Sequence, residues 1–150
     1  MANQKELDGV YMQTALAHAS LSKAIRAQVG AVLVTSQGVT LTGYNGTPKG
    51  RDNCCEEWKN QAFPHEPVLV TKSEVIHAEL NCIMKAAREG VSCIDSTVYV
   101  TLAPCVQCSA MMVQAGVKRL VYNKPYRDAY GLSLLEGSGV KVQQFSETQI

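Results

Sequence analysis

The stretch STVYVTLAPCVQC, residues 96–108, joins a β-strand to a pair of cysteines. Its first seven residues are rich in β-branched side chains, which is typical of a strand. Pro104 follows, and Cys105 and Cys108 form a C-x-x-C where the strand gives way to a helix. Alone, this motif fits a redox pair, half of a structural zinc site or an accident of composition. A partner elsewhere in the chain has to decide between these interpretations.

A histidine and a glutamate near the start of another predicted helix supply that partner. In SEVIHAELNCIM, residues 73–84, one alanine separates His77 from Glu79. A histidine near a helix start is by itself more often a cap or a partly buried side chain. Here His77 lies 28 residues before Cys105, and the intervening helix and strand form a crossover. Such a crossover brings the two helix starts together at one edge of the sheet.

One histidine and two cysteines make three zinc ligands and leave a fourth position to water, as in a catalytic site. Helix N-termini favour thiolates, and zinc lowers the pKa of bound water to about 7. Glu79 lies about 200° around a helix from His77, which places it beside the open position, where it can move protons. Without the cysteines, a solvated first-turn glutamate would be the better interpretation. The pattern H-A-E with P-C-V-Q-C is typical of zinc-dependent nucleobase deaminases.

Apolar periodicity and turn residues predict helices and strands around a mixed sheet. Residues 46–72 show no clear period and are predicted to form a long loop. The order α-β-β-α-β-α-β-α-β predicts a single domain over residues 1–150, a three-layer α/β/α sandwich with a mixed five-stranded sheet. The predicted helices span residues 7–21, 75–88, 109–115 and 129–136, and the predicted strands span residues 29–35, 39–45, 96–102, 118–123 and 140–145.

Composition limits location and partners. The 150 residues are 46% hydrophobic and 18% charged, with no long apolar run, so no membrane span is expected. The N-terminus MANQKELDG has no apolar signal core, which predicts a cytoplasmic protein whose six cysteines stay reduced. The 14 Lys and Arg are scattered and the net charge is +1, so no nucleic-acid polymer is predicted as a partner.

Five segments together resemble the deoxycytidylate (dCMP) deaminases within the cytidine deaminase superfamily. They are RAQVGAVLV (residues 26–34), TGYNGTPKG (42–50), IHAELNCI (76–83), YVTLAPCVQC (99–108) and AGVKRLVYNKPYRD (115–128). H-A-E and P-C-x-x-C belong to the whole superfamily, whereas GYNG with its following proline, joined to QVGA, resembles the dCMP branch. The resemblance covers nearly the whole chain and implies a cytidine-deaminase-like fold.

The resemblance implies a zinc ion bound by His77, Cys105 and Cys108. It implies hydrolytic deamination of dCMP to dUMP and ammonia, which supplies dUMP for thymidylate synthesis. Zinc hydroxide would attack C4 of the pyrimidine, and Glu79 would protonate N3 and then the departing amine.

The resemblance also implies a substrate site. Asn45 matches the superfamily asparagine that contacts the sugar, although Tyr44-Asn45-Gly46 is also ordinary turn chemistry. Tyr126 matches an aromatic position near the nucleotide, and Arg51 is a further cation available for a 5′-phosphate. The predicted substrate-binding residues are Arg26, Asn45, Thr47, Lys49, Ala78 and Tyr126.

Family members are commonly hexamers activated by dCTP and inhibited by dTTP, with Mg²⁺ on the triphosphate. The resemblance therefore implies a homo-hexamer in which Gly43, Tyr44 and Gly46 contact such an effector, although the reduced length of the chain puts this control in question.

The remaining cysteines have two interpretations. Cys54 or Cys55 could bind a second zinc ion together with His65, or they could be free thiols in a loop. Both interpretations stay open, because no fourth ligand stands out. Cys82 and Cys93 are predicted to be small core residues.

Other functions share the predicted zinc site. A deaminase acting on dCTP, cytidine or cytosine would keep the same metal chemistry, but the nucleoside and the free base need no phosphate-binding cation. A tRNA adenosine deaminase would need a basic surface for its polymer. A zinc-stabilised binding module would keep the metal and have no activity to lose.

Overall fold

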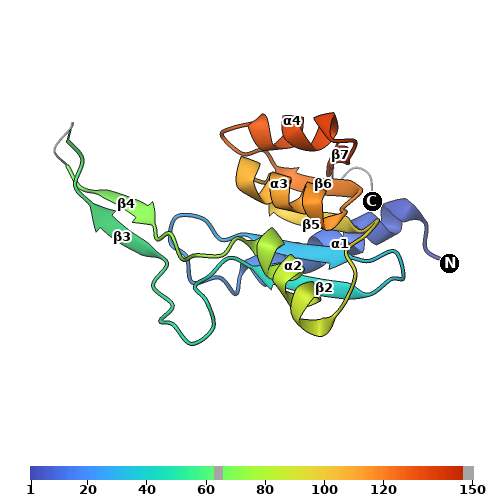
Figure 1. The fold of residues 1–150 in the computed structure, drawn as a ribbon, viewed down its shortest axis with the longest axis horizontal. Coiled ribbons are helices and arrows are strands. Elements are labelled where there is room, and N and C mark those ends of the chain that lie inside the picture. The colour runs from blue at the N-terminus through green and yellow to red at the C-terminus, as the bar shows by residue number, and fades with distance from the viewer. Residues whose placement is uncertain (63–65, 147–150) are drawn as a thin grey trace.

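The computed structural model describes residues 1–62 and 66–146, in which helices cover both faces of a five-stranded sheet (Figure 1). The strand order is β2-β1-β5-β6-β7, with β1 antiparallel to both neighbours and β5, β6 and β7 parallel. The predicted mixed sheet is confirmed. The elements are α1 (Gln4–Ala19), β1 (Gly30–Val34), β2 (Thr40–Tyr44), β3 (Glu56–Lys59), β4 (Val68–Thr71), α2 (Ala78–Glu89), β5 (Thr97–Leu102), α3 (Val106–Ala115), β6 (Arg119–Lys124), α4 (Tyr130–Gly137) and β7 (Lys141–Gln144).

Side chains that alternate along the strands build a core on each face of the sheet. On one face, Met12 of α1 packs with Val32 and Tyr99. On the other face, α2, α3 and α4 cover the larger core, so the predicted three-layer arrangement is confirmed. Cys82 and Cys93 lie in this second core, as predicted. Its buried members are Ala31, Leu33, Ala78, Cys82, Ala86, Cys93, Val98, Val100, Cys108, Met112, Val117, Leu120, Leu135 and Val140.

The prediction of a loop over residues 46–72 is wrong in part, because this segment contains a two-stranded sheet. Strands β3 and β4 pair antiparallel, with Glu56 opposite Thr71 and Lys59 opposite Val68. They project from the body of the molecule (Figure 1). Each strand has four residues and a largely exposed surface, so the sequence carries no core-facing alternation there. We call β3 and β4 together the arm.

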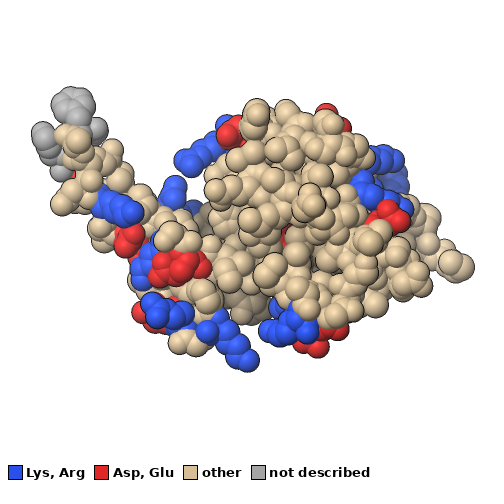
Figure 2. All heavy atoms as spheres, viewed as in Figure 1, with Lys and Arg blue, Asp and Glu red and all other residues tan. Residues whose placement is uncertain are grey.

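The visible surface is not uniformly basic. On the face shown in Figure 2, charged side chains of both signs gather along the arm and at its junction with the body, while much of the body is uncharged. Among residues 1–62 and 66–146, no helix combines the length and apolar character needed to cross a membrane.

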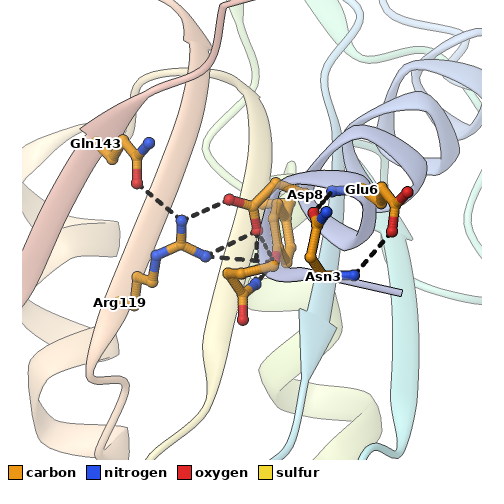
Figure 3. A network of polar contacts seen from close by, with 7 residues as sticks. Asn3, Glu6, Asp8, Arg119 and Gln143 are labelled. Atoms are coloured by element: carbon orange, nitrogen blue, oxygen red, sulfur yellow. Dashed lines mark hydrogen bonds and ion pairs between the residues drawn. The ribbon is translucent and has the colours of Figure 1, made fainter. Parts of the chain in front are cut away.

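A nearly buried ion pair ties α1 to β6 on the face of the sheet that α1 covers (Figure 3). Arg119 of β6 donates from Nη1 and Nη2 to the two carboxylate oxygens of Asp8, at 2.8 and 2.6 Å. Tyr99 donates to Asp8 at 2.6 Å, and Arg119 also donates to Gln143 of β7 at 2.8 Å. Burial raises the pKa of Asp8, but the hydrogen bonds from Arg119, Tyr99 and Gln4 outweigh burial and lower the pKa. Asp8 therefore stays charged at neutral pH and fixes α1 over the sheet.

Replacing Asp8 with alanine should lower the free energy of unfolding by about 3 kcal/mol, because it leaves the Arg119 charge nearly buried and unpaired. The measurement is chemical denaturation at pH 7. Glu89→Ala is the matched control, since its pair with Arg88 is exposed and should cost less than about 1 kcal/mol. Equal effects of the two substitutions would contradict this account of the ion pair.

Candidate active site

Two helix starts carry the predicted metal ligands, and two of the three ligand residues are N-caps. His77 caps α2 and Cys105 caps α3, both with extended backbone (ψ 156° and 168°). N-cap side chains normally accept a hydrogen bond from the first turn, but neither of these does. Their ligand atoms are therefore available to a metal. Cys108 lies one turn into α3 and is buried.

The helix bounds correct two predictions. The second helix begins at Ala78, not at residue 75, because Ile76 exchanges backbone hydrogen bonds with Gly46 and stays extended. The third helix begins at Val106, not at residue 109. His77 thus precedes its helix, so the helical rotation predicted between His77 and Glu79 does not describe their relation.

The three ligand atoms lie close enough to share one metal ion. His77 Nδ1 is 3.2 Å from Cys108 Sγ and 3.6 Å from Cys105 Sγ, and all three atoms lie within 4.8 Å of one another. Tetrahedral zinc, with bonds of about 2.3 Å to sulfur and about 2.0 Å to nitrogen, holds such atoms about 3.5 Å apart. The cluster therefore fits a zinc ion with three protein ligands.

The electrostatics of the cluster favour a thiolate. Hydrogen bonds from Cys108 and His77 lower the pKa of Cys105 to about 3, against the opposing effect of burial. The neighbouring Cys105 sulfur raises the pKa of Cys108, so one thiol proton is retained while Cys105 ionises. Hydrogen bonding to Cys105 raises the pKa of His77. A metal ion that replaces these protons meets ligands already in place.

Glu79 lies in the first turn of α2 and is 3% exposed. Burial raises the pKa of its carboxyl, and the helix backbone and His77 act in the opposite direction. A raised pKa makes the carboxylate a stronger proton acceptor, as general acid-base catalysis requires. This environment differs from that of a solvated first-turn glutamate.

A cavity of about 250 Å³ brings Glu79 together with the ligand residues His77 and Cys105. Four of the six predicted substrate-binding residues line it: Arg26, Asn45, Ala78 and Tyr126.

Asn45 holds the loop that leads into β1. Its Oδ1 accepts from the Val29 backbone N–H at 2.8 Å, and its Nδ2 donates to the Ala27 carbonyl at 2.8 Å. Asn45 therefore shapes the cavity wall, whichever ligand the cavity takes.

Thr47 and Lys49 lie elsewhere. They line a second hollow together with the predicted effector residues Gly43, Tyr44 and Gly46. Gly43 also has a packing role, since a Cβ there would lie 2.6 Å from the Ala78 carbonyl oxygen and separate β2 from α2. The cations lining this hollow are Lys23, Lys49, Arg51, Lys85 and Arg88.

Three polar cavity residues, Glu56, Thr71 and Arg127, were missed by sequence reasoning. Arg127 follows Tyr126 in the PYRD segment, and its guanidinium carbon lies 5.6 Å from the Tyr126 ring centroid. Its place after a strand that ends near the metal ligands was a usable signal. Glu56 and Thr71 carry no such signal, because both lie in residues 46–72, where the apolar residues show no clear period.

The possible second zinc site is not assembled by the described residues. Within residues 1–62 and 66–146, His77, Cys105 and Cys108 are the only group of potential ligands arranged to hold a metal. Cys54 is exposed and Cys55 is buried. His65 lies outside the described residues, so that site stays a prediction.

The family model described as the cytidine and deoxycytidylate deaminase zinc-binding region matches residues 5–124, which include all three ligand residues and Glu79. The chain belongs to this deaminase family. It is 34% identical over 143 residues to the deoxycytidylate deaminase of Saccharomyces cerevisiae, covering 95% of this chain and 46% of the yeast protein. It is 35% identical over 127 residues to that of Mycobacterium phage D29, covering 81% and 98%.

A crystal structure of dCMP deaminase from the cyanophage S-TIM5, in complex with dCMP and dUMP, has a similar fold. The TM-score is 0.81 at 35% identity, over 96% of this chain and 100% of that one. The predicted resemblance to dCMP deaminases is confirmed. The chain spans less than half the length of the yeast relative and nearly the whole of the two phage proteins.

Replacing Cys108 with serine should abolish stoichiometric zinc binding by this deaminase-family chain, because the soft thiolate ligand is lost. The measurement is metal analysis of protein dialysed against zinc, and the unsubstituted chain should retain one ion. Cys54→Ser, which alters an exposed thiol outside the cluster, should retain the same amount. Undiminished zinc in Cys108→Ser would contradict the assignment, and a loss in Cys54→Ser would indicate a second metal.

Proposed function

We propose that residues 1–150 act as one zinc-dependent deaminase domain that hydrolyses dCMP to dUMP and ammonia. The observation that carries the proposal is a single cavity joining the His77, Cys105 and Cys108 cluster to buried Glu79, with arginines in its lining. The dCMP deaminase relatives support the choice of substrate.

The chemistry divides between the metal and the carboxyl. His77, Cys105 and Cys108 would hold a zinc ion, which would lower the pKa of a water molecule and so supply a nucleophile for C4 of the pyrimidine. Glu79 takes a proton from that water and delivers it to N3 of the base. It then takes the second proton from the oxygen now bonded to C4 and delivers it to the amino group as the C4–N bond breaks, so water and dCMP become dUMP and ammonia. Its burial beside the cluster supports this role as proton shuttle.

The other residues that line the cavity bind the nucleotide in this proposal. We assign Arg26, with help from Arg127, to the 5′-phosphate, because one guanidinium group can donate two hydrogen bonds to two phosphate oxygens at once. Asn45 contacts the sugar, and Tyr126 and Ala78 border the base and sugar. Thr47 and Lys49 line the second hollow and are assigned to an effector instead.

Regulation is proposed at that second hollow. Its five cations suit the triphosphate of a dCTP activator or a dTTP inhibitor with Mg²⁺, placed beside Gly43, Tyr44 and Gly46. In this proposal the enzyme is a cytoplasmic hexamer whose dUMP feeds thymidylate synthesis. The net charge of +1 and the mixed signs of the charges on the face shown in Figure 2 favour a free nucleotide over tRNA as substrate.

Glu79→Gln should remain folded and zinc-loaded while kcat for dCMP falls at least about 10²-fold, because loss of general acid-base catalysis commonly costs about 10² to 10⁴ in rate. The measurement is ammonia release under saturating dCMP, with circular dichroism and metal analysis on the same samples. Glu74→Gln, an exposed glutamate just before α2, is the control and should keep full activity. An active, zinc-loaded Glu79→Gln would exclude the proton-shuttle role.

Arg26→Ala should raise KM for dCMP by about 10- to 100-fold, the range for losing one hydrogen-bonded charged contact, and leave kcat/KM for deoxycytidine unchanged. The comparison isolates the phosphate, because the two substrates share base and sugar. Equal losses on both substrates would exclude Arg26 as the phosphate ligand.

A further inference from the structure

We propose that Glu56, at the base of the arm, is a positioning residue that sets the orientation of Arg26 and thereby the preference for nucleotides over nucleosides. The inference rests on the proposed function, because it assumes that Arg26 receives the 5′-phosphate. It assigns Glu56 a role through Arg26, not through contact with the reacting atoms.

The carboxylate of Glu56 binds the backbone of the segment it would position. Glu56 Oε1 accepts from the Ile25 N–H at 2.7 Å and from the Arg26 N–H at 3.3 Å. Glu56 is 6% exposed and both hydrogen bonds are partly buried, so removing the carboxylate takes the acceptor away from two N–H groups that water reaches only in part.

The second strand of the arm holds the guanidinium of the same residue. Thr71 lies directly opposite Glu56 in the β3-β4 register. Its Oγ1 accepts from Arg26 Nη1 at 3.3 Å. One cross-strand pair therefore contacts both the backbone and the side chain of Arg26, and all three residues line the cavity.

The segment needs this support because it has no regular structure of its own. It lies between α1 and β1. Asn45 holds its end and the Ser22 hydroxyl holds its start, each through hydrogen bonds to the backbone. Between these ends, the N–H groups of Ile25 and Arg26 donate to Glu56. An arginine on an unsupported loop loses side-chain and backbone conformational entropy when it binds a phosphate. An arginine already held in place loses less. Glu56 reduces the loss of conformational entropy when Arg26 binds a phosphate. Through Glu56, the charged residues where the arm joins the body take part in nucleotide recognition.

The test measures binding of dUMP and of deoxyuridine to the zinc-loaded protein by titration calorimetry, which needs no turnover. Glu56→Ala should raise Kd for dUMP by about 10-fold, as expected for the loss of one hydrogen-bonded carboxylate, and leave Kd for deoxyuridine within about twofold. Glu56→Gln keeps an acceptor oxygen and should stay within about threefold of the unsubstituted protein for dUMP. Glu56→Asp, whose shorter side chain withdraws the carboxylate, should behave like Glu56→Ala and serves if the alanine variant does not fold.

If Glu56 acts through Arg26, its substitution should have no effect on dUMP binding once Arg26 is absent. In an Arg26→Ala background, Glu56→Ala should cause no additional loss of dUMP affinity, because the group it positions is gone. Additive losses, or equal losses for dUMP and deoxyuridine, would overturn the positioning role. Tighter dUMP binding by Glu56→Gln would overturn it too, since that outcome means the carboxylate faces and repels the phosphate.

These results separate the two proposals. If phosphate-dependent binding follows this pattern but dCMP is not deaminated, the positioning role stands and the proposed function falls. If dCMP is deaminated but the Glu56 variants show no nucleotide-selective loss, the proposed function stands and the positioning role falls. An unsubstituted protein that binds dUMP no better than deoxyuridine overturns the positioning role.

Discussion

The juxtaposition of two helix starts at one edge of the sheet is the constraint on which the site depends. His77 and Cys105 cap separate helices, and the sheet that carries those helices brings their ligand atoms within one coordination sphere. The turn before Cys105 is supported from behind by α4. A Cβ at Gly131 would lie 2.4 Å from the Pro104 carbonyl oxygen, so only glycine permits this approach. Packing against α4 therefore fixes the turn that presents a metal ligand.

Around this centre, chemistry and recognition come from different parts of the chain. The helix starts supply the metal ligands and Glu79, where burial raises the carboxyl pKa. The irregular segment before β1, the arm and the residues after β6 supply the polar rim, including Arg26 and Arg127. The sheet and its helices thus position the proposed reacting groups, and the irregular segments form the rim through which a ligand would enter.

The sequence was most informative where side-chain chemistry is specific. His77, Glu79, Cys105 and Cys108 were predicted as one constellation because few other functions require those residue types at that spacing. The five-stranded sheet was predicted because its strands bury a face and so carry a periodic pattern. The arm was not, since four-residue strands with exposed faces carry no such pattern.

Long-range pairing also escaped prediction. The bond between Ile76 and Gly46, which delays the start of α2, joins segments 30 residues apart in the sequence. Glu56 reaches Arg26 across a similar separation, through a carboxylate that resembles any surface glutamate in the sequence. Asn45 fits turn chemistry and a ligand role equally well, and in the structure it already has a scaffold role.

The most direct test of the central claim is ammonia release by the zinc-loaded protein offered dCMP, CMP, deoxycytidine and dCTP separately. The account predicts that dCMP is turned over most efficiently, because the cavity combines the proposed zinc ligands and Glu79 with two arginines, Arg26 and Arg127, which we assign to a single 5′-phosphate. Preferred turnover of deoxycytidine, or no turnover of any of the four, would contradict it.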